Sequence, residues 1–195
     1  LSRPDVSFRY VRQGKVLYHS AGDGKLSSAV FSIYGKEMRT MYKVHGHEAG
    51  IIADGYVGVS DNARSTRSHQ SFFINGRYMK SALLSASVEA ACRESVPQGR
   101  YPSCVLHLTM PFDMVDVNVH PNKLECRFQN ELALSAALEA VIRASMADRN
   151  PLDNAGTIQL NATPAMPATP VVVNKQETVI KTVSTSATKT AAVPA

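Results

Sequence analysis

The stretch QSFFINGRYMKSALLSASVEAACRESVPQGRYPSCVLHLTM, residues 70–110, decides the fold. The Asn75-Gly76 pair after an apolar run predicts a strand, a tight turn and a short returning strand over 70–79. Apolar residues at helical spacing then predict a helix over 81–96 that ends before Pro97. The apolar run 103–110 predicts a buried strand.

The flanking sequence extends this pattern of strands with interspersed helices. We expect two strands over 6–20 that turn at Gln13-Gly14, a short helix over 26–35 closed by Gly35, and two more strands over 41–60. A last amphipathic helix is expected over 130–146, with Asn130 as its N-cap. The order of elements predicts an α/β fold: a two-layer α+β sandwich with helices on one face of a mixed sheet.

Composition bounds the class of protein. The chain has 195 residues, 44% hydrophobic, which is enough for one domain with a core. It begins with Leu1, so we expect a fragment or a processed product. No apolar stretch approaches the length that spans a bilayer, and no signal peptide is evident, so no membrane partner is expected. The three cysteines form no CxxC pair, which favours a reducing compartment and core packing over zinc or disulfides.

The composition changes near Asn150. Residues 150–195 contain no aromatic residue and little charge, and they are rich in Ala, Thr, Pro and Val. Such a segment buries too little apolar surface to offset its conformational entropy. We therefore predict a folded domain over 1–149 and a disordered linker over 150–195.

A basic stretch lies within the domain. Residues 62–88 contain no Asp or Glu, yet they carry five basic or titratable side chains: Arg64, Arg67, His69, Arg77 and Lys80. The net charge of +5 also permits an anionic partner. Two interpretations stay open: contacts to nucleic-acid phosphates, or a solvated face. Arg77 could instead hold the turn in which it lies.

A second unusual stretch is DVNVHPNKLECRF, residues 116–128. Apolar and polar residues alternate on both sides of a His120-Pro121 break, which predicts a strand, a fixed turn and a second strand. Pro121 fixes its own φ and pushes His120 towards extended geometry, so the turn is expected to restrict the direction of the Lys123 side chain. An ammonium group held in one direction suits a contact to a phosphate. The alternative is that His-Pro merely terminates a strand and Lys123 is solvated.

Other candidate sites are weaker. AGDGKLS lacks the spacing and the Ser or Thr of a phosphate-binding Walker loop, so we expect a plain turn. His45 and His47 lie on one side of a strand, but two ligands do not make a metal site. His107 lies in an apolar strand, which favours a hydrogen-bonded core residue over a catalytic base.

The two unusual stretches together resemble a known family. DVNVHPNKLECRF resembles the DVNVHP-x-K-x-E-V-R-F signature of MutL-type DNA mismatch repair proteins. FFINGRYMKSALLSASVEAA is similar to the F-V-N-G-R strand and the helix after it in the same family. RPDVSFRYVRQGKVLYHSAGDGKLSSAVFSIYG is similar to the stretch that opens the second domain. These matches keep their order and cover nearly all of 1–149.

The resemblance implies a function. MutL-type proteins are GHKL ATPases, as gyrase and histidine kinases are, and this chain matches their second, transducer domain. That domain resembles domain 2 of a small-subunit ribosomal protein, with a left-handed βαβ crossover. The lysine of HPxK, here Lys123, reaches the γ-phosphate of ATP in the first half of the same subunit. ATP and magnesium would belong to the intact parent, so this chain alone is expected to bind no cofactor and to be inactive.

The resemblance also implies partners. They are DNA, through Arg64, Arg67, Arg77 and Lys80, the GHKL ATPase half, a second subunit in a homodimer and a MutS-like mismatch recognition protein. A bacterial, cytoplasmic and nucleoid-associated parent is expected. The sequence departs from the family at Ala82, where some members have a basic residue, and at Cys126, where Val is usual. The alternative is a free-standing nucleic-acid-binding module of the same fold without ATPase function.

Overall fold

The computed structural model describes residues 1–35, 40–117, 119 and 124–148. The linker predicted over 150–195 lies outside these residues, as do Lys123 and the His120-Pro121 pair. No helix among the described residues is long and apolar enough to cross a membrane.

The N-terminal hairpin forms as predicted. Strands β1 (Phe8–Arg12) and β2 (Lys15–Ser20) pair antiparallel as a two-stranded sheet. Gln13 and Gly14 have φ angles of 51° and 75°, the left-handed geometry that a two-residue hairpin turn requires. Helix α1 (Leu26–Tyr34) follows, and Gly35, with φ of 59°, ends it as expected.

The centre of the fold is a five-stranded mixed sheet in the order β3-β4-β7-β5-β6. Its strands are β3 (Tyr42–Glu48), β4 (Ile51–Gly58), β5 (Gln70–Ile74), β6 (Arg77–Met79) and β7 (Ser103–Thr109). Neighbours are antiparallel except β5 and β7, which run parallel with Phe72 opposite Leu106. The connection between these parallel strands passes through β6 and α2 (Ala82–Ala91). The left-handedness of this crossover stays a prediction.

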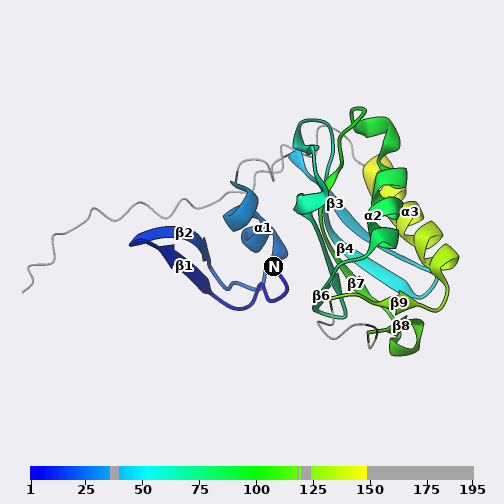
Figure 1. The fold of residues 1–195 in the computed structure, drawn as a ribbon, viewed down its shortest axis with the longest axis horizontal. Coiled ribbons are helices and arrows are strands. Elements are labelled where there is room, and N and C mark those ends of the chain that lie inside the picture. The colour runs from blue at the N-terminus through cyan, green and yellow to red at the C-terminus, as the bar shows by residue number, and fades with distance from the viewer. Residues whose placement is uncertain (36–39, 118, 120–123, 149–195) are drawn as a thin grey trace, which may run out of the picture. The chain divides into compact units, whose positions relative to one another are not determined.

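Helices α2 and α3 (Glu131–Ala147) pack side by side over one face of the sheet (Figure 1). The main core lies between these two layers. It joins sheet residues such as Val44, Phe72 and Leu106 to Leu84 and Leu138 of the helices, all of which are buried. The predicted two-layer arrangement of helices on a mixed sheet is confirmed for this face.

Helix α1 departs from the expectation that all helices share one face. Its residue Val30 packs with Met41, Phe73 and Val105 in a second, smaller core. Because side chains alternate along a strand, Phe73 and Val105 point away from the face that carries Phe72 and Leu106. Helix α1 therefore contributes to the opposite face.

The N-cap predicted at Asn130 is present, the second helix has a cap that was not predicted, and that helix is shorter than expected. Asn130 accepts a hydrogen bond from the amide of Ala133 at 3.0 Å, and Ser81 caps α2 by accepting from Leu84. Helix α2 ends at Ala91, and a 3₁₀ turn, η4 (Arg93–Ser95), follows. Further 3₁₀ turns among the described residues are η2 (Ser60–Asn62), η3 (Arg67–His69) and η5 (Phe112–Met114).

Candidate functional site

The stretch 116–128 forms less strand than its alternation predicts. Strands β8 (Val115–Asp116) and β9 (Arg127–Phe128) pair antiparallel as a separate two-stranded sheet. Val117 and Val119 lie outside any strand, so the expected longer strand is wrong. Among the described residues the ladder has no third strand beside it, and two residue pairs alone give little support for further extension. The alternation therefore indicated partial burial and not strand length.

The described residues on both sides of Lys123 are held by main-chain hydrogen bonds. The amide of Lys80, directly after β6, donates to the carbonyl oxygen of Leu124 at 2.6 Å. The amide of Gln129 donates to the carbonyl oxygen of Met114 at 3.1 Å, which extends the β8–β9 ladder by one step. The chain before and after residues 118–123 is thus fixed to the folded domain.

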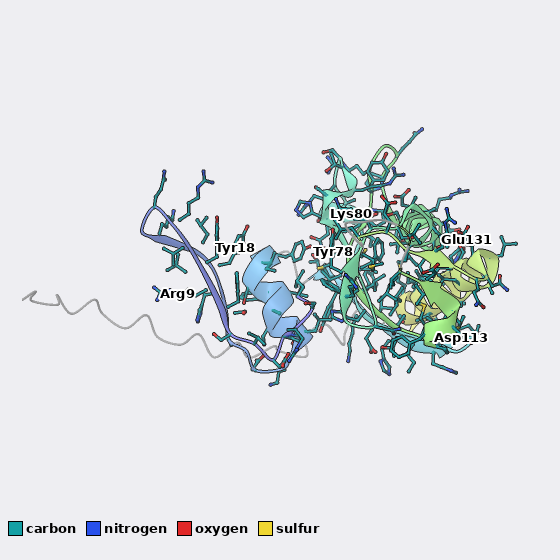
Figure 2. The ribbon with its side chains drawn as sticks, turned by 60° about the horizontal axis from the view of Figure 1, so that its bottom comes forward. Arg9, Tyr18, Tyr78, Lys80, Asp113 and Glu131 are labelled. Atoms are coloured by element: carbon teal, nitrogen blue, oxygen red, sulfur yellow. The ribbon has the colours of Figure 1, made fainter. Side chains whose placement is uncertain are left out.

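A groove of about 880 Å³ lies beside this ladder. Its lining comes from β6, the first turn of α2 and residues 125–131, and it includes Lys80 and Glu131, which are labelled in Figure 2. Apolar residues Phe72, Met79 and Phe128 line its base. Charged residues of both signs line it as well: Arg67, Lys80, Glu125 and Glu131.

Arg67 is engaged by two neighbours. Its guanidinium makes two hydrogen bonds to the Glu89 carboxylate, from Nε at 2.6 Å and from an Nη at 2.9 Å. It also lies over the Tyr101 ring, 4.4 Å from the centroid. The hydrogen bonds from Arg67 hold the pKa of Glu89 below its ordinary value. Much of the positive charge of Arg67 is therefore offset within the domain.

The other basic candidates lie in different surroundings. Arg64 forms a two-way main-chain bridge with Tyr101, at 2.8 Å in each direction. Arg77 is exposed on β6 opposite Ile74, and no described residue pairs with its guanidinium, which gives no support to a turn-holding role. Lys80 is exposed immediately after β6. Arg67 and Lys80 thus both line the groove, whereas Arg64 and Arg77 are not among its lining residues.

The sequence of this domain is similar to a known family of DNA repair proteins. A family model described as "DNA mismatch repair protein, C-terminal domain" matches residues 30–147. The chain belongs to this family. It is 40% identical over 147 residues to the DNA mismatch repair protein MutL of Desulforudis audaxviator, covering 75% of this chain and 26% of that protein. It is 38% identical over 150 residues to MutL of Geobacillus kaustophilus, covering 76% and 24%.

A solved structure supports the fold of this mismatch repair chain. It is described as "Crystal Structure of N terminal domain of a DNA repair protein" and superposes with a TM-score of 0.60 at 17% identity. The match covers 80% of this chain and 52% of the other. The mismatch repair chain therefore has an α+β fold found in a DNA repair protein, and it spans about a quarter of the length of the MutL relatives.

Sequence reasoning missed the acidic partners of the basic stretch. Glu89 comes immediately after the acid-free run, and α2 places it against Arg67, which is 22 residues earlier. Glu125 and Glu131 reach the same groove from the opposite side. The position of Glu89, one residue past the run, was the available signal. In space, the basic stretch of the mismatch repair chain is accompanied by carboxylates.

The structure also describes the surroundings of the weaker candidates, which are His45, the AGDGK stretch and His107. His45 pairs through Nδ1 with Asp54 on the neighbouring strand, and the described residues contain no group of three or more His, Cys, Asp or Glu suited to a metal. Gly24 and Gly22 have positive φ, and Asp23 accepts hydrogen bonds from the Lys25 amide and the Ser28 hydroxyl, which makes AGDGK a turn before α1. His107 stacks on Phe73 at 4.7 Å between centroids, and its Nε2 is buried without a described partner.

The cysteines behave as packing residues. Cys92 and Cys104 are buried, Cys126 is half-buried at the groove, and none forms a disulfide. Burial raises the pKa of Cys92 to about 12 and that of Cys126 to about 11. Both thiols are therefore protonated at neutral pH and poor nucleophiles.

Proposed function

We propose that the chain is the transducer-type part of a mismatch repair ATPase, and that Lys123 contacts the γ-phosphate of ATP held by the preceding GHKL half. The observation that carries this proposal is the fixation of the chain on both sides of Lys123. The Lys80–Leu124 hydrogen bond and the β8–β9 ladder hold the ends of the segment that contains it. A lysine between fixed ends keeps a smaller set of positions than one on a long free loop.

The chemistry required of Lys123 is electrostatic. ATP and magnesium, when bound in the parent, supply the phosphoryl group and most of the charge neutralisation. The ammonium of Lys123 would add one point charge at the terminal phosphate and would link the position of this domain to the nucleotide state. This chain supplies the lysine and the main-chain contacts that hold the ends of its segment, while the nucleotide site belongs to the other half.

The N-terminal hairpin supports the existence of that other half. Large apolar side chains are exposed along it: Phe8, Tyr10, Val11, Val16, Leu17 and Tyr18. Figure 2 shows Arg9 and Tyr18 on its two strands. A two-stranded hairpin is marginal alone, and an apolar surface of this kind marks an interface. We propose that the ATP-binding half of the parent covers it.

We further propose that the domain contributes to DNA binding. Arg77 on β6 and Lys80 immediately after it are exposed, while Arg67 is offset by Glu89. We expect weak, sequence-independent and salt-sensitive contacts to phosphates. Arg77 and Lys80 should contribute more than Arg64 and Arg67, and Glu125 and Glu131 should keep DNA from the far wall of the groove. A homodimer and a MutS-like recognition protein are the further partners proposed for the parent.

ATP turnover by the full-length parent tests the role of Lys123. Lys123→Ala should lower kcat by about a hundredfold, because one positioned charge at a transferring phosphate contributes about 3 kcal/mol. Lys123→Arg should restore part of the rate, since a planar guanidinium does not reproduce a compact ammonium. Lys43→Ala removes an exposed lysine from β3 and serves as the matched control. Parental turnover by Lys123→Ala, with circular dichroism showing a folded protein, would refute the sensor role.

The salt dependence of DNA binding tests the basic surface. With a short labelled duplex, the double variant Arg77→Ala/Lys80→Ala should reduce the slope of log affinity against log salt by about one to two. Arg64→Ala/Arg67→Ala should reduce it less. Equal slopes for the chain and the first double variant would leave these residues as a solvated face. The free-standing nucleic-acid-binding module would be favoured by a different pair of results. In that case Arg77→Ala/Lys80→Ala would reduce the salt slope as expected, while Lys123→Ala would leave ATP turnover unchanged.

A further inference from the structure

Asn75 makes an unusual set of contacts at the end of β5. Its amide donates to the carbonyl oxygen of Leu108 at 2.9 Å. Its side-chain Nδ2 donates to the carbonyl oxygen of Met110 at 3.0 Å, and its Oδ1 accepts from the Met110 amide at 3.0 Å. The side chain thus satisfies both main-chain polar groups of one residue, as a neighbouring strand would.

The reason for this arrangement lies in the sheet. The parallel ladder between β5 and β7 ends with Ile74 opposite Leu108, because β5 turns back into β6 at Asn75-Gly76. The main chain of Met110 therefore lacks a strand partner although the residue is only 5% exposed. Leaving a buried main-chain amide or carbonyl group unpaired is costly in free energy. The side-chain carboxamide of Asn75 removes that cost by pairing with both groups of Met110.

Few side chains suit this position. The φ of Asn75 is 47°, a left-handed conformation that Asn adopts more readily than most residues. The position also needs a donor and an acceptor on one planar group at the reach of a single methylene. Asp lacks the donor and Gly lacks both groups. The requirement explains the Asn of the INGR sequence without reference to DNA or ATP.

Both ends of the same hairpin hold the chain around Lys123. Asn75, at its tip, holds Met110, from which the chain continues through η5 into β8. Lys80, after its second strand, holds Leu124. We propose that the β5–β6 hairpin acts as a clamp and that Asn75 is a positioning residue for the segment that carries Lys123. This inference rests on the function proposed for Lys123, and its first test does not require that function.

Hydrogen exchange in the full chain gives the first test. Asn75→Gly keeps the turn geometry and removes the side chain, and Asn75→Asp keeps the shape and the acceptor but loses the donor. Ala49→Gly is the matched control, because Ala49 has φ of 49° in the Ala49-Gly50 turn of the β3–β4 hairpin. Asn75→Gly should raise exchange of the Met110 amide by about fivefold, since a lost hydrogen bond corresponds to about 1 kcal/mol.

The decisive readout is a more distant amide. Gln129 donates to Met114, beyond η5, so its exchange should rise in both Asn75 variants and stay unchanged in Ala49→Gly. Thermal melting checks that each variant is folded. If the Met110 amide responds and Gln129 does not, Asn75 only satisfies Met110 locally and the positioning role is wrong. Unchanged exchange at Met110 would overturn the inference as well.

ATP turnover of the full-length parent separates this inference from the proposed function. Asn75→Asp should lower kcat in the same direction as Lys123→Ala and leave the KM for ATP unchanged, because the nucleotide site itself is intact. Faster exchange at Gln129 together with parental turnover would support the clamp and refute the γ-phosphate role of Lys123. Faster exchange with a reduced kcat would support both.

Discussion

Two antiparallel hairpins of this molecule share one turn geometry and differ in their burial and in their neighbours. Gln13-Gly14 joins β1 to β2 with φ angles of 51° and 75°, and Asn75-Gly76 joins β5 to β6 with 47° and 80°. Every residue of β1 is exposed, whereas Phe72, Phe73 and Ile74 of β5 are buried. The comparison shows that a turn sequence specifies a hairpin and leaves open what the hairpin packs against.

The neighbours of each hairpin account for the difference. β5 lies beside β7 in a parallel ladder, and both faces of the sheet are covered there, by α2 and α3 on one side and by the small core around Val30 on the other. β1 and β2 pair only with each other among the described strands. Under our proposal, the missing neighbour of the first hairpin is the ATP-binding half of the parent.

The largest expected effect comes from truncating one Phe in each hairpin. Phe72 is 2% exposed and Phe8 is 60% exposed. Phe72→Ala should lower the free energy of unfolding of the chain by about 3–5 kcal/mol through lost burial and a cavity. Phe8→Ala should change it by less than about 0.5 kcal/mol. Urea unfolding followed by circular dichroism measures both, and a similar loss in the two variants would contradict the contrast.

A smaller effect is expected when the proposed cover of the first hairpin is present. Amides of β1 and β2 should exchange at least about tenfold more slowly in the full-length parent than in this chain, equivalent to ~1.4 kcal/mol. Amides of β5 should change little, because their neighbours are already present. Exchange that is equally fast in both proteins would show that the hairpin has no cover in the parent, and the proposed interface would be wrong.

Local signals in the sequence predicted local structure well. The Gly-containing turns, the Gly35 helix end and the Asn130 cap each depend on residues next to one another, and each is present. The mixed sheet under helices was also predicted, because periodicity separates strands from helices before their partners are known. The position of α1 on the opposite face was missed, since periodicity does not say which face an element covers.

The candidate site was less predictable because its contacts are distant in sequence. The pairing of Arg67 with Glu89 depends on how α2 packs, and alternation in 116–128 could not show that only two residue pairs would form. Lys123 was found from the rigidity of Pro121 and the family signature, and its role stays a prediction. The acid-free run was correctly read along the chain, yet it is not acid-free in space.

Acid sensitivity should distinguish the buried hairpin from the exposed one. His107 stacks on Phe73 of β5, and burial lowers its pKa below the ordinary value. The unfolded chain therefore binds a proton at His107 before the folded chain does, so stability should fall as pH decreases through about 6.5. The loss should stop once the pH is below the folded pKa.

Unfolding midpoints in urea at several values between about pH 5 and 8 measure this loss. His107→Leu should remove part of the pH dependence. His19→Leu, at an exposed position on β2, is the control and should leave the dependence unchanged. Identical pH profiles for the chain and His107→Leu would show that His107 is not responsible.

The smallest effect concerns the turns themselves. Gln13 adopts a left-handed φ that Asn tolerates better, so Gln13→Asn should stabilise the first hairpin by about 0.5 kcal/mol, seen as slower exchange of β1 and β2 amides. Asn75→Gln should have a larger, destabilising effect on urea unfolding, because its longer side chain no longer fits both polar groups of Met110. If the stability changes caused by Gln13→Asn and Asn75→Gln were equal and opposite, turn propensity alone would explain both positions. The unequal result that we expect would show that the second turn also bears a tertiary contact, which the first turn lacks among the described residues.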